Sequence, residues 1–210
     1  PRSLLNAAEQ EGMDLCQFTG PPVIAGEVWG RGKDFERIGF RGRVALTNFT
    51  FRAFNTDAVV TEINYTNLVL EAIEPRLWRG TQTVAAAGIT ADFNTLRVYF
   101  TNGFSTVDPG PLTHAIGPVV EAAMAPYHFL EAPTVRFEGY IPLSDPNDVD
   151  IRFDGLAGPF ASLKFKVPRI SAHVHWSTNT LTVTNVQADF YDGTGQGWAH
   201  FIFPETPGAQ

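Results

Sequence analysis

Apolar and polar residues alternate along most of this chain, and the clearest example runs from residue 169 to residue 184. Apolar residues from Ile170 to Trp176 occupy every second position, with serine and histidine between them. After a short polar turn, leucine and valine alternate with threonine. Since successive side chains of a strand point to opposite faces, this pattern predicts a hairpin with one apolar face and one polar face.

The same alternation recurs around residues 49–53, 96–100, 149–154 and 162–167. Turn-forming residues separate these runs at Asn102-Gly103, at 145–147, at 177–179 and at Asp192-Gly193. Clean alternation is typical of antiparallel sheets with one solvated face, so we expect a mainly β protein. Two segments, 3–14 and 110–126, instead space their apolar residues as a helix does, and the second has Pro111 and Pro126 near its ends.

A weak internal repeat relates the two halves of the chain. The segment RIGFRG (37–42) resembles DIRFDG (150–155), and the same offset of 113 residues pairs Leu68 with Leu181 and Gly80 with Gly193. Without a gap, this offset lays 59, 61 and 63 on 172, 174 and 176 with the same strand parity. We therefore expect two tandem copies, 1–109 and 110–203, each a short helix followed by about six strands, and a tail or linker at 204–210.

Composition narrows the classes of function. The chain has 210 residues, of which 44% are hydrophobic and 18% charged, as expected of a folding sequence. Its formal net charge of -7, with no basic stripe, disfavours a nucleic-acid partner. The single cysteine, Cys16, cannot form an internal disulfide. Because the sequence begins at Pro1 without a signal peptide, we expect a fragment of a longer protein, whose targeting or anchoring segment lies elsewhere.

No combination of residues argues for catalysis. His173 and His175 are spaced as zinc ligands often are, but two histidines on the polar face of a strand need no metal. The DPNDVD segment (145–150) departs from the calcium-loop pattern, and GTGQG (193–197) lacks the lysine and the helix of a phosphate loop. The sequence thus predicts no enzyme, cofactor or metal, with a metal-dependent hydrolase using His173 and His175 as an alternative to test.

The central question is where the apolar face goes. It can close on itself as a sandwich, or curl into an elongated open groove that offers apolar side chains to a ligand. A dozen one-sided strands would expose far more apolar area than a soluble monomer tolerates, so an open groove would need a lipid-like partner. The residues expected to line such a groove are Phe49, Phe51, Leu96, Val98, Phe100, Ile151, Phe153, Leu163, Phe165, Val167, Val174, Trp176, Leu181 and Val183.

Two phrases of the sequence resemble a known family. In TLTVTNVQADFYDGTGQG (180–197), Leu181, Val183, Ala188, Tyr191 and Gly193 fill the pattern L-x-L-x-x-x-x-A-x-x-Y-x-G. The segment FEGYIPLSDPNDVDIRFDGLAG (137–158) has a similar F-x-G-x-I entry, and the first copy departs from the pattern by placing proline where the alanine stands. These phrases resemble the AsmA-like group of bacterial envelope proteins, which includes TamB.

The resemblance implies a taco-shaped β-groove that carries lipid acyl chains. It further implies a periplasmic location, a membrane anchor in a part of the chain outside this sequence, and a role in lipid transport or outer-membrane biogenesis. It brings no catalytic residues. The alternative is a structural β-repeat or cell-surface module with a closed, phenylalanine-rich sandwich core.

Overall fold

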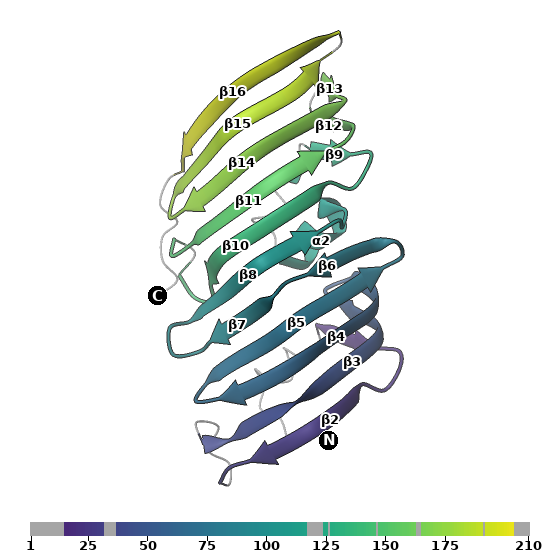
Figure 1. The fold of residues 1–210 in the computed structure, drawn as a ribbon, viewed down its shortest axis with the longest axis vertical. Helices are drawn as coiled ribbons and strands as arrows, with labels where there is room; N and C mark the ends of the chain where they lie inside the picture. Colours follow the sequence, from purple (N-terminus) through teal and green to yellow (C-terminus); the bar gives the residue numbers. More distant parts are fainter. Residues whose placement is uncertain are drawn as a thin grey trace.

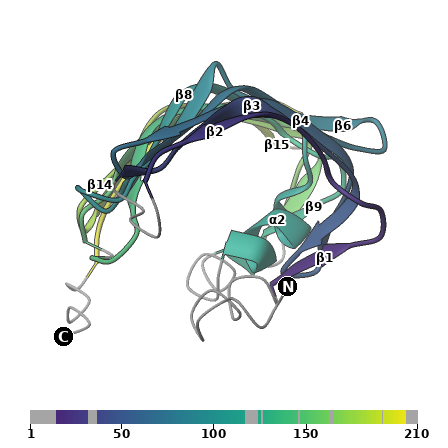
Figure 2. The same ribbon diagram turned by 90° about the horizontal axis from the view of Figure 1, so that it is seen from below.

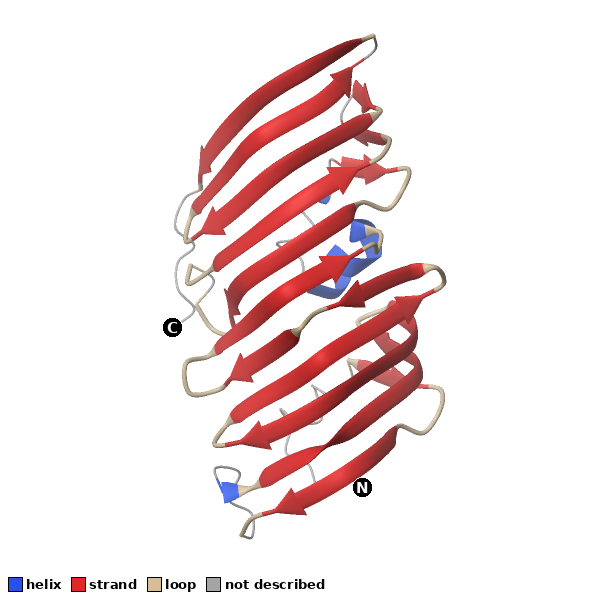
Figure 3. Cartoon of the chain, in the orientation of Figure 1, coloured by secondary structure: helices blue, strands red, loops and turns tan. Residues whose placement is uncertain are grey.

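A computed structural model describes residues 15–31, 37–116, 124–125, 127–145, 147–162, 165–190 and 192–203. Over these residues the fold is mainly β, with a 13-stranded antiparallel sheet, a separate 3-stranded sheet and one short helix (Figure 3). The prediction of a mainly antiparallel β protein is therefore confirmed. The expected helix at 3–14 lies outside the described residues.

The elements follow one another along the chain with short connections (Figure 1). The first half contains β1 (Cys16–Phe18), β2 (Val23–Trp29), β3 (Gly39–Phe51), β4 (Phe54–Thr66), β5 (Val69–Arg79), β6 (Gln82–Ala85), β7 (Gly88–Asp92) and β8 (Arg97–Ser105). After the helix α2 (Pro109–Ile116) come β9 (Tyr127–Phe129), β10 (Thr134–Pro142), β11 (Asp150–Ala157), β12 (Phe160–Ser162), β13 (Phe165–Val167), β14 (Arg169–Ser177), β15 (Thr180–Phe190) and β16 (Gly193–Ile202).

Strand order in the large sheet nearly repeats chain order: β1-β3-β4-β5-β6-β8-β10-β11-β14-β15-β16, with β2 beside β3 and β7 between β5 and β8. The small sheet has the order β13-β12-β9. Seen along the stack, the large sheet is an arch, with α2 and β9 on its inner side (Figure 2). The long strands of this sheet cross the arch, so each contributes one face to the inner side and one to the outer side (Figure 2).

The described core is small and lies along one border of the arch. Phe54 and Val107 are 4% and 2% exposed and pack with Leu112 of α2. Farther along the stack, Ala157 and Ala188 pack under Val167 of the small sheet. Both clusters lie where α2 or the small sheet covers the inner side of the large sheet.

The structure corrects two local predictions. Asn102 and Gly103 lie inside β8 rather than in a turn, where Gly103 faces Phe137 across the sheet. Leu96, expected to begin that strand, occupies the turn before it with a φ of 55° and is 44% exposed. The helix expected at 110–126 is described as α2 over 109–116, and most of its second half lies outside the described residues.

Candidate functional site

The strand register aligns apolar residues in an unbroken row across the inner side of the arch. Each member faces the next directly on the neighbouring strand, so all members lie on the same face. We call this the apolar row; from β2 to β16 it consists of Gly26, Gly42, Ile63, Ala72, Ile89, Phe100, Gly139, Ile151, Trp176, Leu181 and Phe201.

A second row, one residue away on each strand, is almost entirely polar. Because neighbouring residues of a strand point to opposite faces, this polar row lies on the outer side of the arch. Its members from β2 to β16 are Glu27, Arg41, Asn64, Glu71, Thr90, Tyr99, Tyr140, Asp150, Ser177, Thr180 and Ile202. Along these two rows the sheet therefore sorts its side chains by polarity.

The inner position of the apolar row follows from its neighbours on the same face. Leu77, which faces Val59 beside the row, packs in the cluster that includes Leu112 of α2. At the other end, Ala188 packs with Val167 and Phe129 of the small sheet. Since α2 and β9 lie inside the arch, the face they contact is the inner one (Figure 2). We call this face, with the apolar row and its apolar neighbours, the apolar face.

Most side chains of the apolar face are only partly buried. Phe100, Phe153 and Val174 are half-buried, while Ile151 is 5% exposed and Phe201 at the edge is 48% exposed. The rings of Phe100 and Phe137 pack edge to face, with their centroids 5.7 Å apart. Among the described residues no large side chain is fully buried.

Eight residues expected from the sequence to line a groove lie on the apolar face. They share it because their strands pair in register: Val98, Phe100, Ile151, Phe153, Val174, Trp176, Leu181 and Val183. They come from four strands, β8, β11, β14 and β15.

The other expected residues are placed differently. Val167 is 5% exposed in the small sheet, and Phe51 packs against the cluster of Phe54 and Val107. Phe49 packs on Phe18 of β1, with ring centroids 5.2 Å apart. Leu163 lies outside the described residues, and the side chain of Phe165 is not among those described.

Sequence reasoning missed part of the apolar face in both halves of the chain. Ile63, Ile89, Phe137 and Phe201 belong to this face but were not expected to line it. The signal was present for Ile63, since the polar residues Glu62 and Asn64 flank it and the internal repeat lays it on Trp176. The short strands β6 and β7 interrupt the alternation that would have included Ile89.

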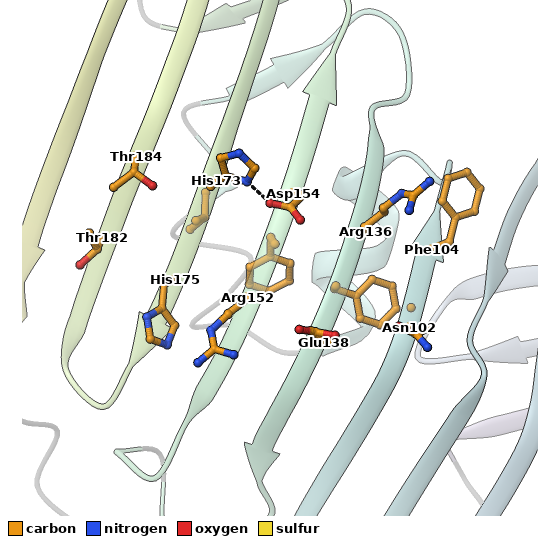
Figure 4. Close-up of a pocket in the computed structure, with 14 residues that line it drawn as sticks. Asn102, Phe104, Arg136, Glu138, Arg152, Asp154, His173, His175, Thr182 and Thr184 are labelled. Carbon is orange, nitrogen blue, oxygen red and sulfur yellow. Dashed lines mark hydrogen bonds and ion pairs between the residues drawn. The ribbon is translucent and has the colours of Figure 1, made fainter.

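The outer side carries the charged side chains, and there the histidines find partners. His173 pairs with Asp154, and His175 Nε2 lies 3.0 Å from Asp150 Oδ1. His173, His175 and Asp154 line an open hollow of about 720 Å³, together with Arg136, Arg152 and other side chains (Figure 4). Within the described part of the chain, no group of three or more histidine, cysteine, aspartate or glutamate side chains is arranged to hold a metal ion.

A tight ion pair ties β10 and β11 to β8 on the outer side. Arg97 donates from Nε and Nη2 to the two carboxylate oxygens of Asp148, at 2.7 and 2.8 Å, and its guanidinium lies 4.5 Å from the ring centre of Tyr140. The hydrogen bonds from Arg97 lower the pKa of Asp148, and the partner carboxylate raises the pKa of Arg97. Asp148 thus ties the loop before β11 to β8, at the junction between the two halves.

Comparison with known proteins gives no relative: no family model, curated protein or solved structure matches the chain. Among the helices of the described residues, none has the length and apolar character needed to span a bilayer. The site is therefore defined by its own geometry, as a continuous apolar face on the inner side of an arched antiparallel sheet.

Proposed function

We propose that this chain is a lipid-binding segment of a bacterial envelope protein. In this proposal the apolar face is the wall of an elongated open groove that takes up lipid acyl chains. The groove would support lipid transfer or outer-membrane assembly, and the chain would act in the periplasm, held to a membrane through parts of the protein outside this sequence. The chain would act by binding and not by catalysis.

The observation that carries the proposal is the apolar row. It runs without a charged or polar member from β2 to β16, whereas its neighbouring row on the other face is almost entirely polar. Acyl chains are long, flexible and without directional polar groups, so a continuous apolar strip suits them better than a polar pocket does.

The distribution of burial favours an open groove over a closed sandwich. In a sandwich, inward side chains of two sheets interdigitate and become dry. Here Phe100, Phe153 and Val174 are half-buried, and the described clusters occupy one border only. The resemblance of 180–197 to AsmA-like proteins supports the same function.

We also propose that the two halves are copies of one unit. In the first half, the short strand β1 pairs with the last residues of β3. In the second half, the short strand β9 pairs with β12, which follows β11 in the chain. The pairing refines the alignment, because Gly42 faces Ile63 while Gly155 faces Ala172. If Gly42 corresponds to Gly155, then Ile63 corresponds to Ala172. The ungapped alignment pairs Ile63 with Trp176 instead, which is four residues away and has the same strand parity.

The first experiment is native mass spectrometry of the purified chain, followed by solvent extraction and lipid analysis. We expect phospholipid or another acyl lipid to co-purify at a defined stoichiometry, and to be exchanged for added phospholipid from vesicles. A lipid-free protein that takes up no acyl lipid from vesicles would contradict the proposal and favour a structural scaffold with a closed core.

A matched pair of variants localises the binding. Phe100 is in the apolar row, and the next residue, Thr101, is exposed on the opposite face of the same strand. We expect Phe100→Glu to lower lipid uptake strongly, because a carboxylate is costly to bury against acyl chains, and Thr101→Glu to leave it unchanged. Circular dichroism must show that both variants keep the β-sheet. Equal uptake by folded Phe100→Glu would remove the groove from this face.

A further inference from the structure

The last strand of the sheet has an unpaired edge that is unusually apolar. β16 pairs with β15 on one side and with no described strand on the other. Trp198 and Ile202 are 76% and 70% exposed, and Phe201 is 48% exposed. An exposed strand edge offers a row of free N–H and C=O groups, and soluble proteins usually protect it with charge, proline or a bulge.

β16 has none of these protections. Its sequence, GTGQGWAHFI, contains no acidic side chain, no lysine or arginine and no proline. The irregularity between β15 and β16 lies on the β15 side, where Val183 and Val186 face residues only two apart. β16 is therefore a regular strand. The opposite edge strand, β2, differs because it carries the carboxylate of Glu27 near its middle.

The hydrogen-bonding pattern fixes which groups of β16 point outward. Phe203 donates its N–H to the carbonyl of Asn179 on the β15 side at 2.8 Å. In an antiparallel strand, residues that bond to the strand on one side alternate with residues that direct their N–H and C=O groups to the other side. Phe203 bonds to the β15 side, so the odd-numbered residues of β16 do so as well. The even-numbered residues from Thr194 to Ile202 therefore direct their N–H and C=O groups away from the sheet.

We propose that β16 pairs with β16 of a second copy of this chain, antiparallel and about a two-fold axis that passes through the sheet at Trp198. In this register each outward residue faces another outward residue: Trp198 faces its copy, and Gln196 faces His200. The pairing joins the two sheets edge to edge and is an interaction beyond the lipid binding proposed above, on which it does not depend.

The side chains support self-pairing in this register. On the apolar face, Gly195 would face Phe201 of the other copy, and Gly197 would face Ala199. A glycine opposite an aromatic residue leaves room for the ring across the strands. No like charges meet along the ladder, because β16 carries no charged side chain other than a protonated His200. A two-fold axis perpendicular to the sheet also keeps both apolar faces on the same side.

Sedimentation and disulfide trapping test the proposal on lipid-extracted protein, in a Cys16→Ser background. We expect a dimer that dissociates on dilution. The single variants Gln196→Cys and His200→Cys should not cross-link by themselves but should link when mixed, because residue 196 of one copy faces residue 200 of the other. Facing Cα atoms in such a pair are about 5.5 Å apart, within the range of a disulfide.

Two controls make the result specific. Trp29→Cys, on the opposite edge strand β2, should link neither with itself nor with the β16 variants. Trp198→Pro removes an outward N–H without touching the bonds to β15, so it should abolish the dimer and keep the native circular dichroism spectrum. A monomer at all concentrations overturns the proposal. So does an oligomer that persists in Trp198→Pro, or one that links β16 to β2.

Discussion

The border and the middle of the apolar face have the same sequence pattern but different surroundings. At the border, Phe54 is 4% exposed and Val107 2%, under Leu112 of α2. In the middle, Phe100 and Phe153 are half-buried, and the contacts described there come from neighbours on the same sheet. The difference teaches that alternation decides which face a side chain joins, whereas the elements on the other side decide whether that face becomes a core.

The largest expected effect is on the free energy of unfolding, and it distinguishes the border of the apolar face from its middle. Phe54→Ala should lower the free energy of unfolding by about 3–5 kcal/mol, because a nearly buried phenylalanine leaves a cavity. Phe153→Ala should cost clearly less, since its side chain is already partly exposed and the lost atoms leave no closed cavity. Urea denaturation of both variants measures the two values. Equal losses would mean that the middle is as dry as the border, which would favour the closed sandwich.

A medium effect is expected from a glycine inside the apolar row. Gly139 has a φ of 126°, and an added Cβ would lie 2.2 Å from the carbonyl oxygen of Asp150. Gly139→Ala should therefore cost at least about 1–3 kcal/mol through backbone strain alone. Gly155 on the neighbouring strand is the matched control, because its added Cβ meets nothing within 4 Å. If Gly155→Ala destabilises the sheet as much, the close approach at Gly139 is not the cause.

The smallest effect concerns the polar face and depends on pH. The lowered pKa of Asp148 stabilises the folded chain above the unfolded-state pKa of about 3.9, and this contribution is lost as the pH falls through the lower folded value. The melting temperature should therefore fall on acidification through this range, and less so in Asp148→Asn. The exposed pair Arg43–Glu62 is the comparison, and Glu62→Gln should change stability by about 0–1 kcal/mol. An unchanged acid profile in Asp148→Asn would contradict this role.

The sequence was sufficient for the antiparallel strands and for the face on which most apolar residues lie. Ile151 and Val174 share the apolar face because the alternation of both strands is regular and the strands pair in register. The sequence was not sufficient where non-glycine residues adopt positive φ. In β3, even-numbered residues such as Phe40 point to the inner side before Asn48, whose φ is 48°. After Asn48, odd-numbered residues such as Phe51 point to the inner side instead. Because few sequence signals mark such residues, strand parity alone cannot predict the change.

The same limit explains the errors at the turns. Asn102-Gly103 has the composition of a hairpin turn, but both residues continue β8, where Gly103 accommodates the ring of Phe137. The glycine serves close packing between strands rather than chain reversal. Leu96 shows the opposite case, a large apolar residue in a turn. In both, tertiary contacts override the local preference, so only the fold reveals the role.

The strand order has a consequence for the time course of folding. Nearly every pair in the large sheet joins strands that are close in the sequence, and even β8 and β10 are separated only by α2, β9 and their connections. Closing short loops loses little chain entropy, so such a sheet can form hairpin by hairpin while the chain is still being synthesised. Each new strand then finds its template already in place, and the apolar face grows with the emerging polypeptide.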